Sequence, residues 1–241
     1  MKLPESLYQG TLLRRYKRFL ADVLLEDGYQ VTVHCPNSGS MMGCSEPGST
    51  VLLSLSEKPG RKYPFTWEMV RVGDTWVGIN TARPNALVLE AVRSKAVPEL
   101  EGYDSIRTEV RYGTNSRIDL LLSGPSGLCH VEIKNVTLME GDAALFPDAA
   151  TERGRKHLRE LIRVVEQGGR GVIFFVVQRG DATRFAPADG IDPEYGRLLR
   201  TAVKKGVEAL AYRAIVTPRA ISLSNRLPIC LSATAPDPTV P

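Results

Sequence analysis

Glu132 and Lys134 lie two residues apart in HVEIKNV (residues 130–136), a segment that otherwise has the composition of a buried strand. Residues at positions i and i+2 of a strand point to the same face, so the two charges share one face of the expected sheet. An exposed ion pair with this spacing is common and contributes less than about 1 kcal/mol. A catalytic role therefore requires further residues from neighbouring elements.

A second carboxylate, Asp119, lies in the preceding strand-like segment, RIDLLLS (117–123). The sequence GPSG (124–127) predicts a turn, which would make the two segments antiparallel neighbours and bring Asp119 close to Glu132. Two adjacent carboxylates repel each other unless a cation joins them. We therefore expect a cation between these two side chains.

The expected chemistry is metal-assisted cleavage of a phosphodiester. Mg²⁺ binds carboxylates together with waters and substrate phosphate oxygens. Held by Asp119 and Glu132, Mg²⁺ or Mn²⁺ would acidify a water and clamp the phosphate, while Lys134 would neutralise developing charge or orient the water. Glu90, on a helix expected before the strands, is a candidate third ligand. The predicted catalytic residues are Asp119, Glu132 and Lys134.

The elements that must position these residues divide the chain near residue 82. Residues 1–82 contain strand-like segments separated by turn residues, a pattern that predicts a five-stranded OB-type β-barrel. The five segments are RRYKRFLADVLLE, YQVTVHC, TVLLSLS, KYPFTWEMVRV and TWVGIN. Residues 83–232 are expected to form a mixed-sheet domain that begins α-β-β-β-α-β and continues α-β, giving a two-domain α/β (α+β) protein. The tail, 233–241, is expected to be disordered.

Composition fits a soluble globular protein and excludes an extreme polyelectrolyte. The 241 residues carry a formal net charge of +4, which permits a polyanionic partner without requiring one. The four cysteines form no C-x-x-C pair, as is typical of buried thiols in a reducing compartment. The sequence has no signal-peptide pattern and no apolar run long enough to span a bilayer. We expect a cytoplasmic protein, associated with the nucleoid if it binds DNA, and no membrane partner.

Two basic segments indicate contact with nucleic acid. In RRYKRF (14–19), the basic side chains could bind phosphates along a single strand of nucleic acid, while an aromatic ring stacks against a base. The helix expected over 151–167 has a basic face opposite an apolar one. The alternative is that both are solvated faces, partly paired with acidic neighbours. The candidate contacts, with one from the Gly-rich loop HCPNSGSMMGC, are Arg14, Arg15, Tyr16, Lys17, Arg18, Asn37, Arg155, Lys156 and Arg159. Glu152 and Arg153 are candidates for supporting the metal site.

The order of these pieces resembles the PD-(D/E)-x-K, or restriction-endonuclease-like, superfamily. Its signature is an Asp on one strand and an acid-x-Lys on the next, here Asp119 and Glu132-Ile133-Lys134, although Asp119 is not preceded by proline. Longer stretches resemble the sugar fermentation stimulation protein (SfsA) family over residues 8 to about 231. These stretches are RYKRFLADV, HCPNSGSMMGC, KYPFTWE, EVRYGTNSRIDLLL, VEIKNVTL and FPDAATERGRKHLREL.

This resemblance implies an OB-type domain followed by a nuclease-like domain, and DNA binding linked to regulation of sugar use, notably maltose metabolism. Three functions stay open. The chain is a metal-dependent deoxyribonuclease with Mg²⁺ or Mn²⁺, a non-catalytic DNA-binding transcription regulator on the same fold, or a binder of nucleotides or small polyanions. The expected partner is DNA, single-stranded or duplex, and a homodimer is an open alternative to a monomer.

Overall fold

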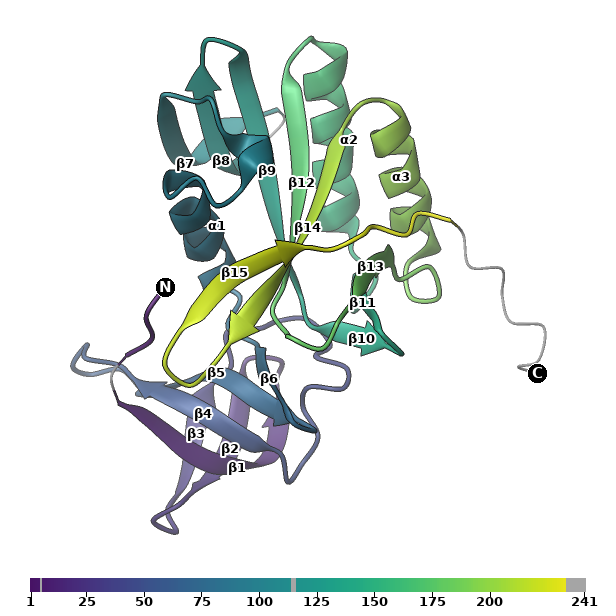
Figure 1. The fold of residues 1–241 in the computed structure, drawn as a ribbon. Coiled ribbons are helices and arrows are strands. Elements are labelled where there is room, and N and C mark those ends of the chain that lie inside the picture. Colours follow the sequence, from purple (N-terminus) through teal and green to yellow (C-terminus); the bar gives the residue numbers. More distant parts are fainter. Residues whose placement is uncertain (5, 114–115, 233–241) are drawn as a thin grey trace, which may run out of the picture.

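The N-terminal strands close into a barrel (Figure 1). The structure is a computed structural model, which describes residues 1–4, 6–113 and 116–232; the predicted disordered tail lies outside them. The strands are β1 (Leu7–Tyr16), β2 (Leu20–Leu25), β3 (Gln30–His34), β4 (Thr50–Leu55), β5 (Phe65–Val72) and β6 (Thr75–Gly78). Five of them pair in the closed order β1-β2-β3-β5-β4-β1, with β3 and β5 parallel and the other pairs antiparallel. The predicted five-stranded OB-type barrel is confirmed.

The strands formed by the first and the last of the five expected segments differ from the prediction. The segment RRYKRFLADVLLE forms two strands rather than one, because Lys17 and Arg18 adopt φ values of 50° and 64° and reverse the chain between β1 and β2. Left-handed conformations are uncommon for non-glycine residues, and the segment contains no Gly, Asn or Pro to signal a turn. The segment TWVGIN forms β6, which pairs with β5 and lies outside the closed ring.

The described residues of the second half form three helices and two sheets (Figure 1). Its elements are α1 (Arg83–Arg93), the 3₁₀ turn η1 (Pro98–Leu100), β7 (Ser105–Tyr112), β8 (Ser116–Gly124), β9 (Gly127–Val136), β10 (Leu138–Glu140), β11 (Ala143–Phe146), α2 (Glu152–Glu166), β12 (Arg170–Val177), β13 (Arg184–Pro187), α3 (Pro193–Lys204), β14 (Glu208–Val216) and β15 (Ile221–Arg226). The main sheet has the order β7-β8-β9-β12-β14-β15, and β10, β11 and β13 form a small sheet beside it.

The predicted mixed sheet is confirmed. The hairpin expected at GPSG joins β8 to β9, and β9, β12 and β14 are parallel neighbours. Four strands are additional to the prediction, namely β10, β11, β13 and β15. The first three are only three or four residues long, too short to show a period of two in the sequence.

Both faces of the main sheet are covered. Along β12, Val172, Phe174 and Val176 belong to the buried cluster that contains the apolar face of α1. The alternate residues Ile173, Phe175 and Val177 pack with α2 and α3 on the other face (Figure 1). This explains why β12 is apolar throughout. Within the described residues, no helix is long and apolar enough to cross a membrane.

The barrel and the main sheet share buried contacts. Leu52 and Met69 of the barrel lie in the same cluster as α1 and the sheet. The backbone N–H of Gly78, at the end of β6, donates to the carbonyl of Gln178 at 2.8 Å. Leu3 also joins this cluster, and its backbone N–H donates to the carbonyl of Arg219, so the first residues of the chain contact the second half. The division at residue 82 into separate domains stays a prediction.

Candidate functional site

Asp119 is held where β8 and β9 separate. The ladder between the two strands ends at the pair Leu120 and Val131. One residue further on, Asp119 Oδ2 accepts the backbone N–H of Ile133 at 2.7 Å. Asn85 of α1 donates its side-chain amide to Asp119 Oδ1 at 2.8 Å. A carboxylate thus satisfies a strand N–H that would otherwise need a backbone carbonyl, and both of its oxygens are positioned.

Glu132 is buried, with 2% of its surface exposed. Its Oε1 accepts from Lys134 Nζ at 2.7 Å and also contacts His157 Nδ1. Burial alone would raise the pKa of Glu132, but the charges and hydrogen bonds of Lys134 and His157 outweigh it and hold that pKa below its ordinary value. Its other oxygen, Oε2, has no hydrogen-bond partner among the described residues. A buried carboxylate oxygen without a partner is costly and is suited to a cation.

The second carboxylate is less well compensated. Burial, followed by the negative charge of Glu132, raises the pKa of Asp119 to about 6 from its ordinary value of 3.8. The hydrogen bonds from Ile133 and Asn85 act in the opposite direction without cancelling this shift. The positive charge near Asp119 is therefore too small to offset its burial and the charge of Glu132.

His157 is a site residue that the sequence reasoning missed. It lies on α2, is 6% exposed, and its Nδ1 is 3.1 Å from Lys134 Nζ. A protonated Nδ1 donates to Glu132, whereas a bare Nδ1 accepts from Lys134, so the two contacts require opposite protonation at this atom. The only signal in the sequence is a histidine next to Leu158 on the apolar face of a helix, which is also typical of a core histidine.

These residues line a pocket of about 440 Å³ at the junction of the barrel and the main sheet. Its walls come from the loop after β3, the start of α1, β7, β8, β9, the segment before α2, and α2. Four carboxylates and two basic side chains line it, giving a formal excess of two negative charges: Glu109, Asp119, Glu132 and Asp148 against Lys134 and Arg153. One divalent cation would balance this excess.

The structure does not bring Glu90 to the pocket. Its side chain is exposed and pairs with the N-terminal ammonium group at 2.9 Å. Asn85, from the beginning of the same helix, reaches Asp119 instead. Glu109 is an additional carboxylate in the pocket, as is Asp148, and the register of β7 and β8 places Glu109 opposite Asp119. The sequence could not distinguish these carboxylates, since the choice depends on how α1 crosses the sheet.

The donor set fits a hard divalent cation. Asp119 and Glu132 offer carboxylate oxygens, and the unpartnered Oε2 atom of Glu132 provides a free acceptor. Oxygen ligands of this kind suit Mg²⁺ or Mn²⁺ better than Zn²⁺. Within the described part of the chain, no group of three or more His, Cys, Asp or Glu side chains is arranged to hold a metal ion. Two carboxylates plus water and phosphate oxygens are therefore the set that the pocket can offer.

The loop after β3 belongs to the pocket wall and is held by Arg15. The Arg15 guanidinium donates to the carbonyls of Arg18, Asn37, Gly39 and Ser40 at 2.7 to 3.1 Å. Asn37 is 5% exposed and accepts the N–H of Gly39, so it supports the loop from inside. Most of its donors are therefore used within the barrel and this loop, and contact between Arg15 and nucleic acid stays a prediction.

Replacing Arg15 by Gln should destabilise the protein by about 2 kcal/mol, because several charge-assisted hydrogen bonds are lost together. Thermal unfolding with and without a nucleic-acid ligand measures this. Arg18→Gln is the matched control, since Arg18 is exposed at the hairpin tip and its side chain has no partner among the described residues. A melting temperature that is unchanged in Arg15→Gln would contradict the structural role.

The remaining cations of RRYKRF are arranged around the β1–β2 hairpin. Arg14 Nε and the Tyr16 hydroxyl both donate to the carboxylate of Asp22, at 2.8 and 3.0 Å, and the Arg14 guanidinium lies 5.0 Å from the Tyr16 ring centre. Asp22 is buried, so these two residues are partly structural. Lys17 and Arg18 are exposed at the tip. Contact between nucleic acid and this hairpin stays a prediction.

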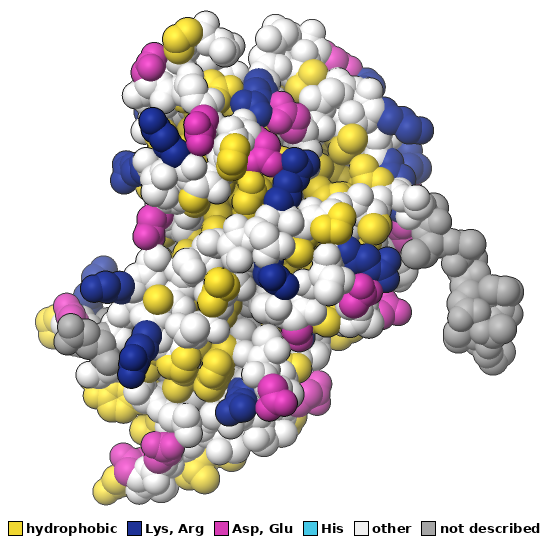
Figure 2. Space-filling model, in the orientation of Figure 1, with side chains coloured by type: hydrophobic (Ala, Val, Ile, Leu, Met, Phe, Trp, Pro, Cys, Tyr) yellow, Lys and Arg dark blue, Asp and Glu magenta, His cyan; other side chains and the backbone are white. Residues whose placement is uncertain are grey.

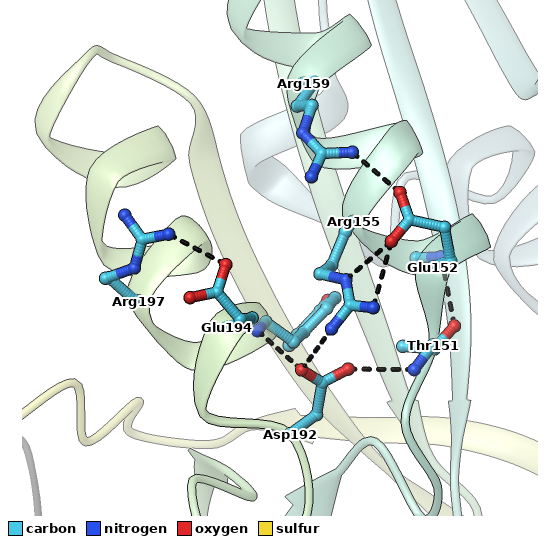
Figure 3. A network of polar contacts seen from close by, with 9 residues as sticks. Thr151, Glu152, Arg155, Arg159, Asp192, Glu194 and Arg197 are labelled. Atoms are coloured by element: carbon cyan, nitrogen blue, oxygen red, sulfur yellow. Dashed lines mark hydrogen bonds and ion pairs between the residues drawn. The ribbon is translucent and has the colours of Figure 1, made fainter.

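The basic face of α2 is largely neutralised within the protein (Figure 3). Arg155 donates to Asp192 at 2.8 Å and to Glu152 at 3.0 Å, and Arg159 donates to Glu152 at 2.9 Å. Lys156 is half-buried and is also engaged. On the face in Figure 2, several dark blue basic side chains likewise lie next to magenta acidic ones. Internal ion pairs therefore compete with a phosphate backbone for these cations, and contact between this helix and nucleic acid stays a prediction.

Asp192 fixes the start of α2 (Figure 3). Its carboxylate is buried and accepts the backbone N–H groups of Thr151, at 2.8 Å, and Tyr195, at 2.9 Å. It therefore caps α3 and holds the residue before α2 at the same time. The Thr151 hydroxyl accepts the N–H of Gly154 at 3.0 Å and caps α2. These contacts set the position of the first helical turns, which carry Arg153 and His157 to the pocket.

Comparison with known families agrees with this architecture. The model described as the SfsA N-terminal OB domain matches residues 13–79. The model described as the sugar fermentation stimulation protein RE domain matches residues 82–220. The chain belongs to the sugar fermentation stimulation protein (SfsA) family.

Relatives in this family are similar over almost their whole length. A sugar fermentation stimulation protein homolog from Pelobacter propionicus is 68% identical over 231 residues, covering 96% of this chain and 100% of the relative. A homolog from Geobacter sulfurreducens is 67% identical over 229 residues, covering 95% and 98%. The solved structure of Pyrococcus furiosus SfsA, in complex with Ca²⁺, is 28% identical with a TM-score of 0.86 and covers 95% of this chain and 99% of its own.

Proposed function

We propose that this SfsA-family chain is a DNA-binding protein with a metal-dependent phosphodiesterase site at Asp119, Glu132 and Lys134. The observation that carries the proposal is the unpartnered Oε2 of Glu132, buried beside the high-pKa carboxyl of Asp119 in a pocket with excess negative charge. The Ca²⁺ complex of the Pyrococcus furiosus relative supports a divalent-cation site in the family.

Each residue has a role that follows from its contacts. Asp119 and Glu132 would hold Mg²⁺ or Mn²⁺, which when bound supplies polarisation of the phosphate and a lower pKa for a water molecule. Lys134 keeps Glu132 ionised and has further donors for a phosphate oxygen or the attacking water. His157 contacts both and limits how far Lys134 can move. Asn85 orients Asp119.

The partner we propose is DNA, single-stranded or duplex, contacted by the OB-type barrel and the pocket together. The loop after β3 lines the pocket, so a strand lying on the barrel beside this loop would pass directly to the carboxylates. The family name describes an effect on sugar fermentation. We propose that DNA binding links the protein to regulation of sugar use, including maltose metabolism, in the cytoplasm.

The second candidate is a non-catalytic DNA-binding regulator on the same scaffold. It is favoured by the way Lys134 and His157 already neutralise Glu132 without any metal. In this case the same residues would stabilise the fold and the cation site would be a remnant.

Incubation of purified protein with single-stranded, duplex and branched DNA distinguishes the phosphodiesterase from the non-catalytic regulator. With Mg²⁺ or Mn²⁺ we expect cleavage that a chelator abolishes and that falls at least about 100-fold in Asp119→Ala and Lys134→Ala. Binding is followed in parallel by fluorescence anisotropy. Salt-sensitive binding with no cleavage in any metal would favour the regulator, and the absence of binding would contradict both candidates.

A further inference from the structure

Arg153 differs from the other arginines of α2. Arg155, Arg159 and Arg163 each donate to a carboxylate within the protein. Arg153 is exposed, lines the pocket, and makes no hydrogen bond or ion pair with any described residue. Folding within this chain therefore does not explain its positive charge.

The position of Arg153 in α2 also indicates a ligand from outside the protein. Thr151 is the N-cap of α2, so Arg153 lies in the first turn, where a cation opposes the helix dipole. An anion bound beside Arg153 would offset this unfavourable interaction. No described residue supplies that anion, since Arg153 makes no hydrogen bond or ion pair with them and the nearby carboxylate of Glu152 is paired with Arg155 and Arg159.

The backbone on both sides of Arg153 is fixed while its side chain is not. The N–H of Thr151 is held by the buried Asp192, and the N–H of Gly154 is held by the Thr151 hydroxyl. Arg155, two residues after Arg153, donates a hydrogen bond to Asp192 (Figure 3). A guanidinium group is thus placed at the pocket from a rigid support, which reduces the entropy lost when it binds a ligand.

Lys134 is the other basic side chain that lines the pocket, and it is already paired within the protein. Lys134 Nζ lies 2.7 Å from Glu132 and 3.1 Å from His157, and its side chain is 12% exposed. Arg153 is therefore the pocket cation that an incoming anion can reach without breaking an internal ion pair among the described residues. Guanidinium groups bind phosphate oxygens in a bidentate geometry.

We propose that Arg153 binds a backbone phosphate of the nucleic acid at the rim of the pocket and thereby positions the neighbouring phosphodiester over Asp119 and Glu132. This inference rests on the proposed function, and it assigns the substrate contact that the paired residues Arg155 and Arg159 were expected to make. Arg153 acts by binding substrate, so its loss should affect substrate affinity more than the turnover of bound substrate.

The test compares Arg153→Ala with Arg197→Ala, a matched control on α3 whose exposed side chain pairs with Glu194 and does not line the pocket. Binding of a fluorescent 30-nucleotide DNA, single-stranded or duplex, is measured by anisotropy with Ca²⁺ between about 50 and 200 mM salt. For Arg153→Ala we expect affinity to fall about 10- to 100-fold. The slope of log K against log salt should decrease by about 0.7 on single strands or about 0.9 on duplex, the value for one phosphate contact. Arg153→Lys should recover part of the loss.

A steady-state measurement adds a second readout with Mg²⁺ or Mn²⁺, where KM should rise in Arg153→Ala while kcat changes less than about threefold. If wild-type protein binds DNA but Arg153→Ala keeps the affinity and salt slope of Arg197→Ala, the inference is wrong while the proposed function stands. If wild type binds but does not cut, the anisotropy result still decides the role of Arg153. If wild type binds no DNA, both the function and the inference are wrong.

Discussion

Asp119→Asn should abolish metal-dependent cleavage and, in the absence of metal, make the protein more stable at pH 8. Burial and the charge of Glu132 raise the pKa of Asp119 to about 6, so the fold favours its protonated form. This contribution is fully present below the ordinary pKa of 3.8 and is lost as pH rises through 6. Asparagine keeps the shape without the charge: its oxygen can accept the N–H of Ile133, and rotation of the Asn85 amide lets the Asn85 oxygen accept from the new NH2 group. We expect a gain of about 1–2 kcal/mol at pH 8, equivalent to about 2–8 °C, and a loss of activity of at least about 1,000-fold.

Melting curves at pH 4 and pH 8, with chelator or with Mg²⁺ or Mn²⁺, measure the stability change. The gain over wild type should be largest at pH 8 with chelator and small at pH 4, where Asp119 is largely protonated in the wild-type fold. Metal should raise the melting temperature of wild type and leave the variant unchanged, because a cation relieves the repulsion only when Asp119 is charged. Asp104→Asn, a change at an exposed carboxylate before β7, controls for the loss of one charge. A variant less stable than wild type at pH 8 without metal would contradict the electrostatic cost.

The centre of this site could be predicted because it depends on local rules. Alternation along β9 puts Glu132 and Lys134 on one face, and the GPSG turn fixes β8 as its neighbour. These two facts suffice to bring Asp119 beside Glu132. The same rules predicted the barrel and the main sheet, except at the turn between β1 and β2, where the sequence carries no turn signal.

The surrounding residues could not be predicted, because they reach the pocket through tertiary packing. His157 and Asn85 come from helices whose rotation and crossing angle the sequence does not state. The charges of Arg15 and Arg155 were visible, but their partners were not. Those partners are backbone carbonyls of a loop and a carboxylate 37 residues away. The basic pattern therefore indicated that the surface is positively charged. Ion pairing within the fold determined which arginine remains available to a ligand.

Lys134→Met should lower stability by about 3 kcal/mol at pH 8 and reduce cleavage at least about 100-fold. Lys134 keeps the pKa of the buried Glu132 below its ordinary value, so Glu132 adds stability above that value in wild type and loses it as pH falls through the lowered pKa. Burial is already the largest single influence on this pKa, and in the variant only the contacts with His157 oppose it, so we expect the sign to reverse. The difference between variant and wild type should therefore widen as pH rises from about 4 to 8, as followed by thermal or urea unfolding.

The control is Lys205→Met, whose partner Glu166 is at a similar distance, 2.6 Å, although both side chains are about half exposed. Removing this surface pair should cost less than about 1 kcal/mol with little dependence on pH. The double variant Glu132→Gln/Lys134→Met should recover most of the stability lost in Lys134→Met, because no buried charge remains. Mg²⁺ or Mn²⁺ should also stabilise Lys134→Met more than wild type, since the ion replaces the missing positive charge beside Glu132. Equal metal stabilisation in both proteins would show that the cation does not bind Glu132, which would contradict the proposed site directly.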